Sequence, residues 1–193
     1  MIFNTAFYQS QFKKLDVYRQ FQSSEQAQTV SQNVINFLCC AQSLNGEFFS
    51  KREVAHMQDV KNIISLVRIQ FYLISGFLIV CLLLLFMLKR VDLILLALKW
   101  GSVLTIISII FLWLLSISNF DGFFLRFHYL TFKNDFWLLP KDSTLIKLFP
   151  EKFFANFANQ IALQAVIMSV VIYGGTKLLE SRLLKIDNLK LKI

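Results

Sequence analysis

The chain has 193 residues, 56% of them hydrophobic, and a mean hydropathy of +0.57. This exceeds the composition of soluble domains and indicates an integral membrane protein. The formal net charge is +8, but the basic residues cluster beside apolar runs, where they set topology and meet anionic lipid, so we expect no nucleic acid partner.

The first 68 residues show a helical pattern. Apolar side chains recur at spacings of three and four residues, namely at Val17, Phe21, Val34, Phe37 and Leu38. Ser50 followed by Glu53 forms a capping box, which predicts a helix that starts there and runs into the first membrane span. On that helix His56 and Asp59 share one face. We therefore expect the Asp59 carboxylate to orient the His56 imidazole and raise its basicity.

Three apolar stretches are long enough to cross a hydrocarbon core of about 30 Å as helices. They are residues 69–88, 100–118 and 161–179. A short connector, residues 89–99, joins the first two, and residues 180–193 form a lysine-rich tail. Basic residues near span ends mark the cytoplasmic side, so the connector and the tail are predicted to be cytoplasmic. Residues 1–68 and 119–160 are then both extracytoplasmic.

An extracytoplasmic region at the start of the chain calls for a signal or an upstream span. Residues 1–68 open with neither, and we hypothesise that the natural protein has a further N-terminal span. The segment 119–160 holds ten phenylalanines among its charged residues, a mixture that suits the headgroup level of a bilayer. We expect short interfacial helices there, broken at Pro140 and Pro150. The predicted fold is one all-α membrane domain over residues 1–193, a helical bundle with three spans and an interfacial extracytoplasmic cap.

The chain has only two histidines, and the predicted topology puts both on the extracytoplasmic side. Imidazole is the side chain whose ordinary pKa lies between pH 5 and 8. His56 lies near Asp59, whereas the residues near His128 are Arg126, Asn134, Trp137 and Asp142. This arrangement favours proton-transfer chemistry on a lipid-borne substrate. Arg126 as a headgroup anchor and Asp142 as a helix cap are the structural alternatives.

Other chemistry has little support in the sequence. GxSxG, HExxH, P-loop and GxGxxG patterns are all missing, which argues against an acyl-enzyme hydrolase and against a nucleotide-driven pump. Cys39 and Cys40 are adjacent and Cys81 lies inside an apolar run. Because a vicinal disulfide is strained and no zinc-ligand spacing occurs, we expect neither cysteine chemistry nor a metal site.

Three blocks carry a resemblance to a known family. They are residues 48–60, which read FFSKREVAHMQDV, residues 127–137, FHYLTFKNDFW, and residues 142–154, DSTLIKLFPEKFF. Weaker likeness reaches back to residues 17–18 and 33–35. In these blocks the chain resembles the bacterial lipoprotein intramolecular transacylases, whose members have four spans. Leu139 departs from the family pattern, which has an acidic residue directly before the proline, and Asp142 would have to take its place.

The resemblance implies an enzyme of the bacterial cell membrane with its active site on the extracytoplasmic face and with no cofactor. Its substrate would be a lipoprotein whose N-terminal cysteine carries a diacylglyceryl group. The sn-2 acyl chain would move to the protein's own α-amine, which gives the lyso-form lipoprotein. His56 and His128 would be the catalytic residues. We hypothesise that one of them acts as the base and the other serves the oxyanion or the leaving group, and we favour His128 as the base and His56, held by Asp59, as its complement. Asp59, Arg126, Asn134, Trp137 and Asp142 would support them or orient the substrate.

Two non-enzymatic readings compete with this one. The histidines could be axial ligands of a haem, which would require them to face each other within a bundle. Alternatively the chain could be a structural membrane subunit, or an inactive truncated homologue, in which both histidines are dispensable.

Overall fold

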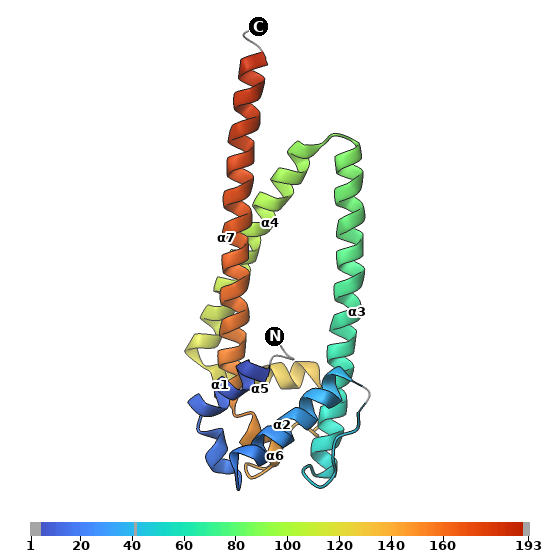
Figure 1. Cartoon of the computed structure of the whole chain (residues 1–193), viewed down its shortest axis with the longest axis vertical. Helices are drawn as coiled ribbons and strands as arrows, with labels where there is room; N and C mark the ends of the chain where they lie inside the picture. Colours follow the sequence, from blue (N-terminus) through green and yellow to red (C-terminus); the bar gives the residue numbers. More distant parts are fainter. Residues whose placement is uncertain (1–4, 41, 191–193) are drawn as a thin grey trace. The chain divides into compact units, whose positions relative to one another are not determined.

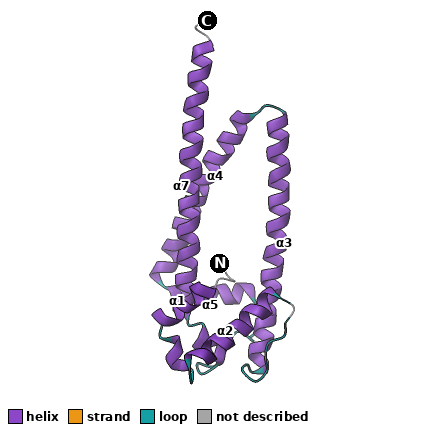
Figure 2. Ribbon diagram, viewed as in Figure 1, coloured by secondary structure: helices purple, strands orange, loops and turns teal. Residues whose placement is uncertain are grey.

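The computed structural model describes residues 5–40 and 42–190, and within them it contains helices and no strand (Figure 2). The elements are α1 (Thr5–Lys14), a 3-10 turn η1 (Val17–Gln20), α2 (Ser24–Cys39), α3 (Lys51–Met87), α4 (Val91–Ser118), α5 (Phe120–Thr131), α6 (Thr144–Leu148) and α7 (Glu151–Lys190) (Figure 1). The predicted all-α membrane fold is confirmed.

The helices fall into two compact units. The first unit comprises Met1–Gln70 and Phe120–Phe157, and the second comprises Phe71–Asn119 and Ala158–Ile193. Both histidines and all the predicted supporting residues belong to the first unit. A single domain over the whole chain stays a prediction.

An aromatic cluster forms the centre of the first unit. Phe7, Tyr8 and Phe12 of α1 pack against Phe149 and Phe153, with ring centroids 5.5–6.3 Å apart between the two groups. Edge-to-face and tilted aromatic pairs at such distances add stability beyond the area they bury. This packing places the start of α7 against α1.

Polar caps set where the helices of the first unit begin. The Ser23 hydroxyl accepts the Gln26 N–H at the start of α2, and Ser143 does the same for Ile146 at the start of α6. Each satisfies a backbone donor that a helix start leaves unpaired. The alternative that Asp142 caps the helix after Pro140 is wrong, because the neighbouring Ser143 is the cap and the Asp142 side chain is exposed.

Among the described residues, three helices are long and apolar enough to cross a membrane: α3, α4 over Val91–Ile117, and α7 over Glu151–Leu183. An 18-residue stretch in each has a mean hydropathy of 2.5, 2.2 and 1.6, respectively. Their large apolar side chains are mostly exposed, as lipid-facing residues of a membrane helix would be. The predicted spans 100–118 and 161–179 lie inside α4 and α7. The predicted span 69–88 lies inside α3 except for Leu88, which follows the last residue of that helix. Residues 91–99 of the predicted connector are part of α4.

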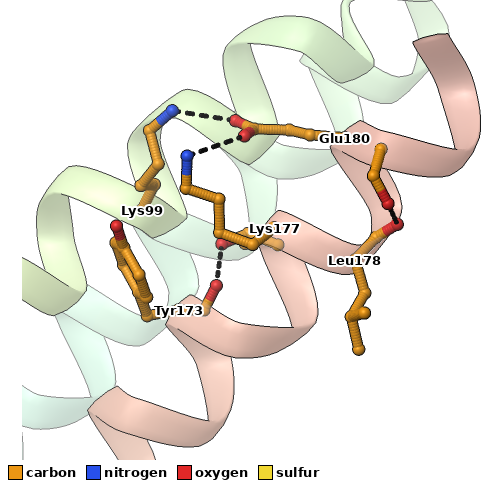
Figure 3. A network of polar contacts seen from close by, with 7 residues as sticks. Lys99, Tyr173, Lys177, Leu178 and Glu180 are labelled. Atoms are coloured by element: carbon orange, nitrogen blue, oxygen red, sulfur yellow. Dashed lines mark hydrogen bonds and ion pairs between the residues drawn. The ribbon is translucent and has the colours of Figure 1, made fainter.

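Within the second unit, an ion pair joins two of these helices. Lys99 Nζ of α4 lies 3.0 Å from Glu180 Oε1 of α7, and Lys177 Nζ lies 3.8 Å from Glu180 Oε2 (Figure 3). The Lys99 and Glu180 side chains are 22% and 28% exposed, so the pair is mostly withdrawn from solvent. Loss of Glu180 would leave the Lys99 ammonium without its counter-charge, whereas loss of Lys99 would leave Glu180 paired with Lys177.

One expectation about the cysteines is wrong. Cys39 and Cys40, at the end of α2, are joined by a disulfide, although strain in a vicinal bridge had argued against it. Cys81, in α3, is a free thiol.

Candidate active site

Hydrogen bonds fix the first turn of α3, the helix that carries His56. The Ser50 N–H donates to Glu53 Oε2 at 2.8 Å, and the Glu53 N–H donates to the Ser50 hydroxyl at 3.3 Å. This is the capping box predicted from the sequence. The other oxygen, Glu53 Oε1, accepts the N–H of Leu145 in α6 at 2.9 Å. The Glu53 side chain is buried, so one carboxylate holds the starts of α3 and α6 together.

A second hydrogen bond joins the start of α6 to the segment just before α3. The Thr144 hydroxyl donates to the Phe48 carbonyl at 2.7 Å. Met57, the residue after His56, is buried in the core of the first unit. The backbone on either side of His56 is therefore anchored, and the position of its imidazole follows from the fold.

His128 lies near the end of α5, and its own helix orients it. Its Nδ1 atom lies 2.8 Å from the Phe124 carbonyl, one turn earlier. A carbonyl oxygen can only accept, so Nδ1 carries the proton and the neutral ring keeps a lone pair on Nε2. Phe124 also packs against Phe154 of α7, with ring centroids 5.2 Å apart.

The two imidazoles face each other. Their ring centroids are 6.2 Å apart and their planes meet at 35°. Phe132 packs on both, at 5.0 Å from His56 and 5.5 Å from His128. Trp137 packs on His128 at 5.1 Å. Aromatic rings thus line the space around both imidazoles.

Both histidines are held neutral. Burial, and after it repulsion from His128, lowers the pKa of His56 to about 4, while attraction by Asp59 opposes the shift. Burial also lowers the pKa of His128, against the hydrogen bond to the Phe124 carbonyl. A buried imidazole loses hydration in its charged form, which is why its protonation is disfavoured. At pH 7 both rings are therefore able to accept a proton.

One polar atom of the pair has no partner in the part of the chain that the structure describes. His56 Nδ1 is buried and makes no hydrogen bond to any residue in the described ranges 5–40 and 42–190. Buried polar atoms are nearly always satisfied, so an exception points to a group that binds there. His56 therefore offers a hydrogen bond that the protein itself does not use.

Asp59 contacts a different residue from the one expected. Its Oδ2 atom accepts a hydrogen bond from the Asn134 amide nitrogen at 2.9 Å, and within the described ranges His56 Nδ1 makes no hydrogen bond to Asp59. Its effect on His56 is electrostatic only. Asn134 Oδ1 in turn accepts the Phe136 N–H at 3.0 Å, and the Arg52 guanidinium donates to the Asp135 carbonyl. Asp59 and Arg52 thereby fix the loop after α5 to α3.

The structure brings together some of the predicted site residues and leaves others apart. Trp137 packs on His128 and on Tyr129, and Asn134 reaches Asp59. Arg126 and Asp142 are exposed, and within the described part of the chain neither makes an ion pair. In the same ranges no group of three or more His, Cys, Asp or Glu side chains could share a metal ion.

Sequence reasoning missed three residues that shape the site: Glu53, Phe124 and Phe132. Glu53 was recognised as part of a capping box, which indicates a local role. Its bond to Leu145 joins residues 92 positions apart, and no local pattern predicts such a contact. The phenylalanines carried no signal, because ten of them occur between residues 119 and 160.

Fold and site together define a class, namely all-helical integral membrane proteins whose first unit holds a pair of neutral imidazoles among aromatic rings. The particular family is shown by comparison. The family model of the lipoprotein intramolecular transacylase Lit matches residues 1–154. The chain belongs to this family, as its sequence blocks predicted.

Relatives and solved structures agree with this assignment. An uncharacterized protein of Aquifex aeolicus (strain VF5) is 27% identical over 124 residues, which cover 64% of this chain and 54% of that protein. The chain thus spans about half the length of that relative. The membrane integral lipoprotein intramolecular transacylase Lit of Bacillus cereus, solved in meso, is 26% identical with a TM-score of 0.68 over 100% of this chain and 87% of that one. A structure of that protein with one histidine replaced by arginine has a TM-score of 0.73 at 26% identity, over 94% of this chain and 82% of that one.

Proposed function

We propose that this chain is an intramolecular acyltransferase that moves the sn-2 acyl chain of a diacylglyceryl-cysteine lipoprotein to that lipoprotein's own α-amine. The observation that carries the proposal is the pair of neutral imidazoles 6.2 Å apart, one with its proton fixed on Nδ1 and the other with an unused Nδ1. Membership of the Lit family supports the reaction class.

The reaction forms one bond and breaks another. The α-amine nitrogen attacks the sn-2 ester carbonyl carbon, the carbonyl oxygen takes the negative charge, and the bond to the sn-2 oxygen then breaks. An amide forms, and the proton lost by the amine ends on the sn-2 oxygen as a hydroxyl. Because nucleophile and ester belong to one molecule, orientation can supply an effective molarity of roughly 10⁵–10⁸ M. No protein nucleophile is needed.

Each histidine has a role that fits its surroundings. His128 accepts the amine proton at Nε2, because its Nδ1 is committed to the Phe124 carbonyl. His56, protonated on its unused Nδ1, donates to the oxygen that becomes negative. Asp59 and Asn134 are positioning residues, since their bond holds the loop that carries Trp137. In this proposal Arg126 and Asp142 contact the substrate headgroup region or its peptide.

The proposed location is the bacterial cell membrane, with the histidines on the extracytoplasmic side. Lys89 and Arg90 lie in the turn between α3 and α4, Lys99 lies in the first third of α4, and Lys177 and Arg182 lie in the second half of α7. Basic residues at these ends favour the cytoplasmic side. The first unit, which holds both imidazoles, would then face the outer leaflet and meet the lipidated N-terminus there.

Mass spectrometry of one lipoprotein's N-terminal peptide tests the reaction. The host would make only the diacylglyceryl form and would express the chain, its His128→Ala variant or an empty vector. The expected result is loss of the free α-amine, with one acyl chain now amide-linked and the total number of chains unchanged. The variant should leave the diacylglyceryl peptide as it was. An unchanged peptide with the parent chain would contradict the proposal and favour a structural membrane subunit.

A further inference from the structure

The first unit contains a cavity of about 540 Å³ that does not include the histidines. It lies between α1, α2 and the segment that follows α2, and amide side chains dominate its lining. The amides are Gln9, Gln28, Gln32, Asn33, Asn36 and Asn45. Cavities that bind ligands commonly measure about 300–1,000 Å³, so this one is large enough for several residues of a peptide.

The amides keep much of their hydrogen-bonding capacity free. Asn33 Oδ1 accepts the Asn45 N–H at 2.9 Å, and Gln32 Nε2 donates to Asn36 Oδ1 at 2.8 Å. These bonds leave the Asn33 amide nitrogen and the Gln32 carbonyl oxygen available. Gln9 and Gln28 make no side-chain hydrogen bond to any other residue among 5–40 and 42–190. The cavity therefore presents donors and acceptors side by side.

Among the residues that the structure describes, no charged side chain lines the cavity. Tyr8 also lines it; its phenol is neutral at physiological pH, and burial raises its pKa further, to about 12. Phe12, Ile35 and Phe48 add apolar surface. A neutral occupant with alternating donors and acceptors matches this lining, and an extended peptide backbone is such an occupant.

The cavity lies within reach of the imidazoles. Phe48 is part of its wall and lies three residues before α3, and His56 is the sixth residue of that helix. Three extended residues and five helical rises give at most about 18 Å between them. An extended peptide of about five or six residues covers that distance at roughly 3.3 Å per residue.

We propose that this cavity binds the peptide that follows the lipidated cysteine of the substrate, at about the fifth to the eighth residue. The proposal rests on the proposed function, because it takes the lipidated cysteine to lie between His56 and His128. Side-chain amides bond to backbone groups of any sequence, so one cavity serves many lipoproteins. The lipid anchors the substrate, and the amides hold its peptide.

Two synthetic lipopeptides test the proposal with the full chain in lipid vesicles. Both carry diacylglyceryl-cysteine, followed in one by a single serine and in the other by nine neutral Ser, Gly and Asn residues. The parent chain should show a kcat/KM at least tenfold higher for the longer one, since each hydrogen bond contributes a factor of about 2 to 12. The double variant Gln28→Leu/Gln32→Leu should reduce this ratio to about three or less, by the same estimate. Gln22→Leu, an exposed glutamine outside the cavity, is the matched control and should keep the ratio.

A photo-crosslinking arm locates the peptide directly. A benzophenone residue six positions after the cysteine should label α2, whereas one directly after the cysteine should not. Equal kcat/KM for both lipopeptides in the parent chain, or a ratio that the double variant keeps, would overturn the cavity proposal alone. Labelling of α2 that a soluble peptidoglycan saccharide displaces, with no dependence on peptide length, would overturn it in favour of a carbohydrate site. Failure to convert either lipopeptide would instead overturn the proposed function.

Discussion

The carboxylate of Glu53 accepts the backbone N–H of Leu145 at 2.9 Å while its other oxygen caps α3. Two helix starts that are far apart in the sequence thus depend on one buried side chain. One of these helices carries His56, so the geometry of the site depends on this contact.

Replacing Glu53 by alanine should destabilise the protein. The change removes a helix cap and leaves the Leu145 N–H without its acceptor, which together cost about 2–4 kcal/mol. The midpoint of thermal unfolding in detergent, followed by tryptophan fluorescence, should fall by several degrees. Lys51→Ala, an exposed residue in the same turn, is the control. An unchanged midpoint for Glu53→Ala would show that water replaces the carboxylate at both helix starts.

The bond between Asp59 and Asn134 should act as a unit. Asp59→Ala and Asn134→Ala should each slow acyl transfer, and the double variant should be little worse than either single one, because all three lose the same contact. A hydrogen bond to a charged group contributes about 1.5–3 kcal/mol, which sets the expected coupling energy. Rates of amide formation on a diacylglyceryl lipopeptide would give it. Fully additive losses would mean that the two residues act separately.

Stability should decrease in acid because of His56. The pKa of His56 is lowered to about 4 in the folded protein, so between about pH 6.5 and pH 4 the unfolded chain binds a proton that the folded protein resists. The contribution of neutral His56 to the free energy of unfolding is fully present above pH 6.5 and is lost as the pH falls to about 4. Discounted for partial exposure, the loss amounts to about 2 kcal/mol. His56→Phe should lose less stability over this range in pH-dependent thermal unfolding, and an equal loss would contradict the assignment.

The pH dependence of the reaction should reflect the substrate amine. Its reference pKa is about 7.7–8.0, whereas the pKa values of both imidazoles are lowered. Between about pH 6.5 and 7.5, log(kcat/KM) should therefore rise with a slope of one. A slope of two would mean that a catalytic imidazole still titrates in this range. Initial rates with one lipopeptide at fixed ionic strength would distinguish these outcomes.

Opposite charges at Lys99 and Glu180 should be exchangeable. Glu180→Lys alone places three ammonium groups together and should lower the thermal midpoint, and Lys99→Glu combined with it should recover most of the loss. Like charges placed this close together repel one another, which is the reason for the expected loss. Lys177→Ala, at 3.8 Å and with its side chain 53% exposed, should have a much smaller effect. No recovery in the exchanged variant would show that the surroundings favour one orientation of the pair.

Much of the fold was predictable because its signals are local. Apolar run length predicted the three membrane helices, and Ser50 with Glu53 predicted the start of α3. Contacts between distant segments were not predictable. The helical spacing of His56 and Asp59 suggested that these two residues interact. Instead, the Asp59 carboxylate accepts a hydrogen bond from Asn134, which is 75 residues away. Both histidines were expected on one side of the membrane, yet their separation depends on how Phe124 and Phe132 pack, and single positions in a phenylalanine-rich segment are indistinguishable by sequence.

The hydrogen bond from His128 to the Phe124 carbonyl has a consequence for the order of events at the site. Both ends of that bond lie within five consecutive residues of one helix, so the protonation pattern of His128 is settled before any ligand arrives. The proton of His56 has no such assignment. His128 is therefore in the tautomer with a free Nε2 lone pair before the ligand binds, whereas His56 takes the tautomer that the ligand requires.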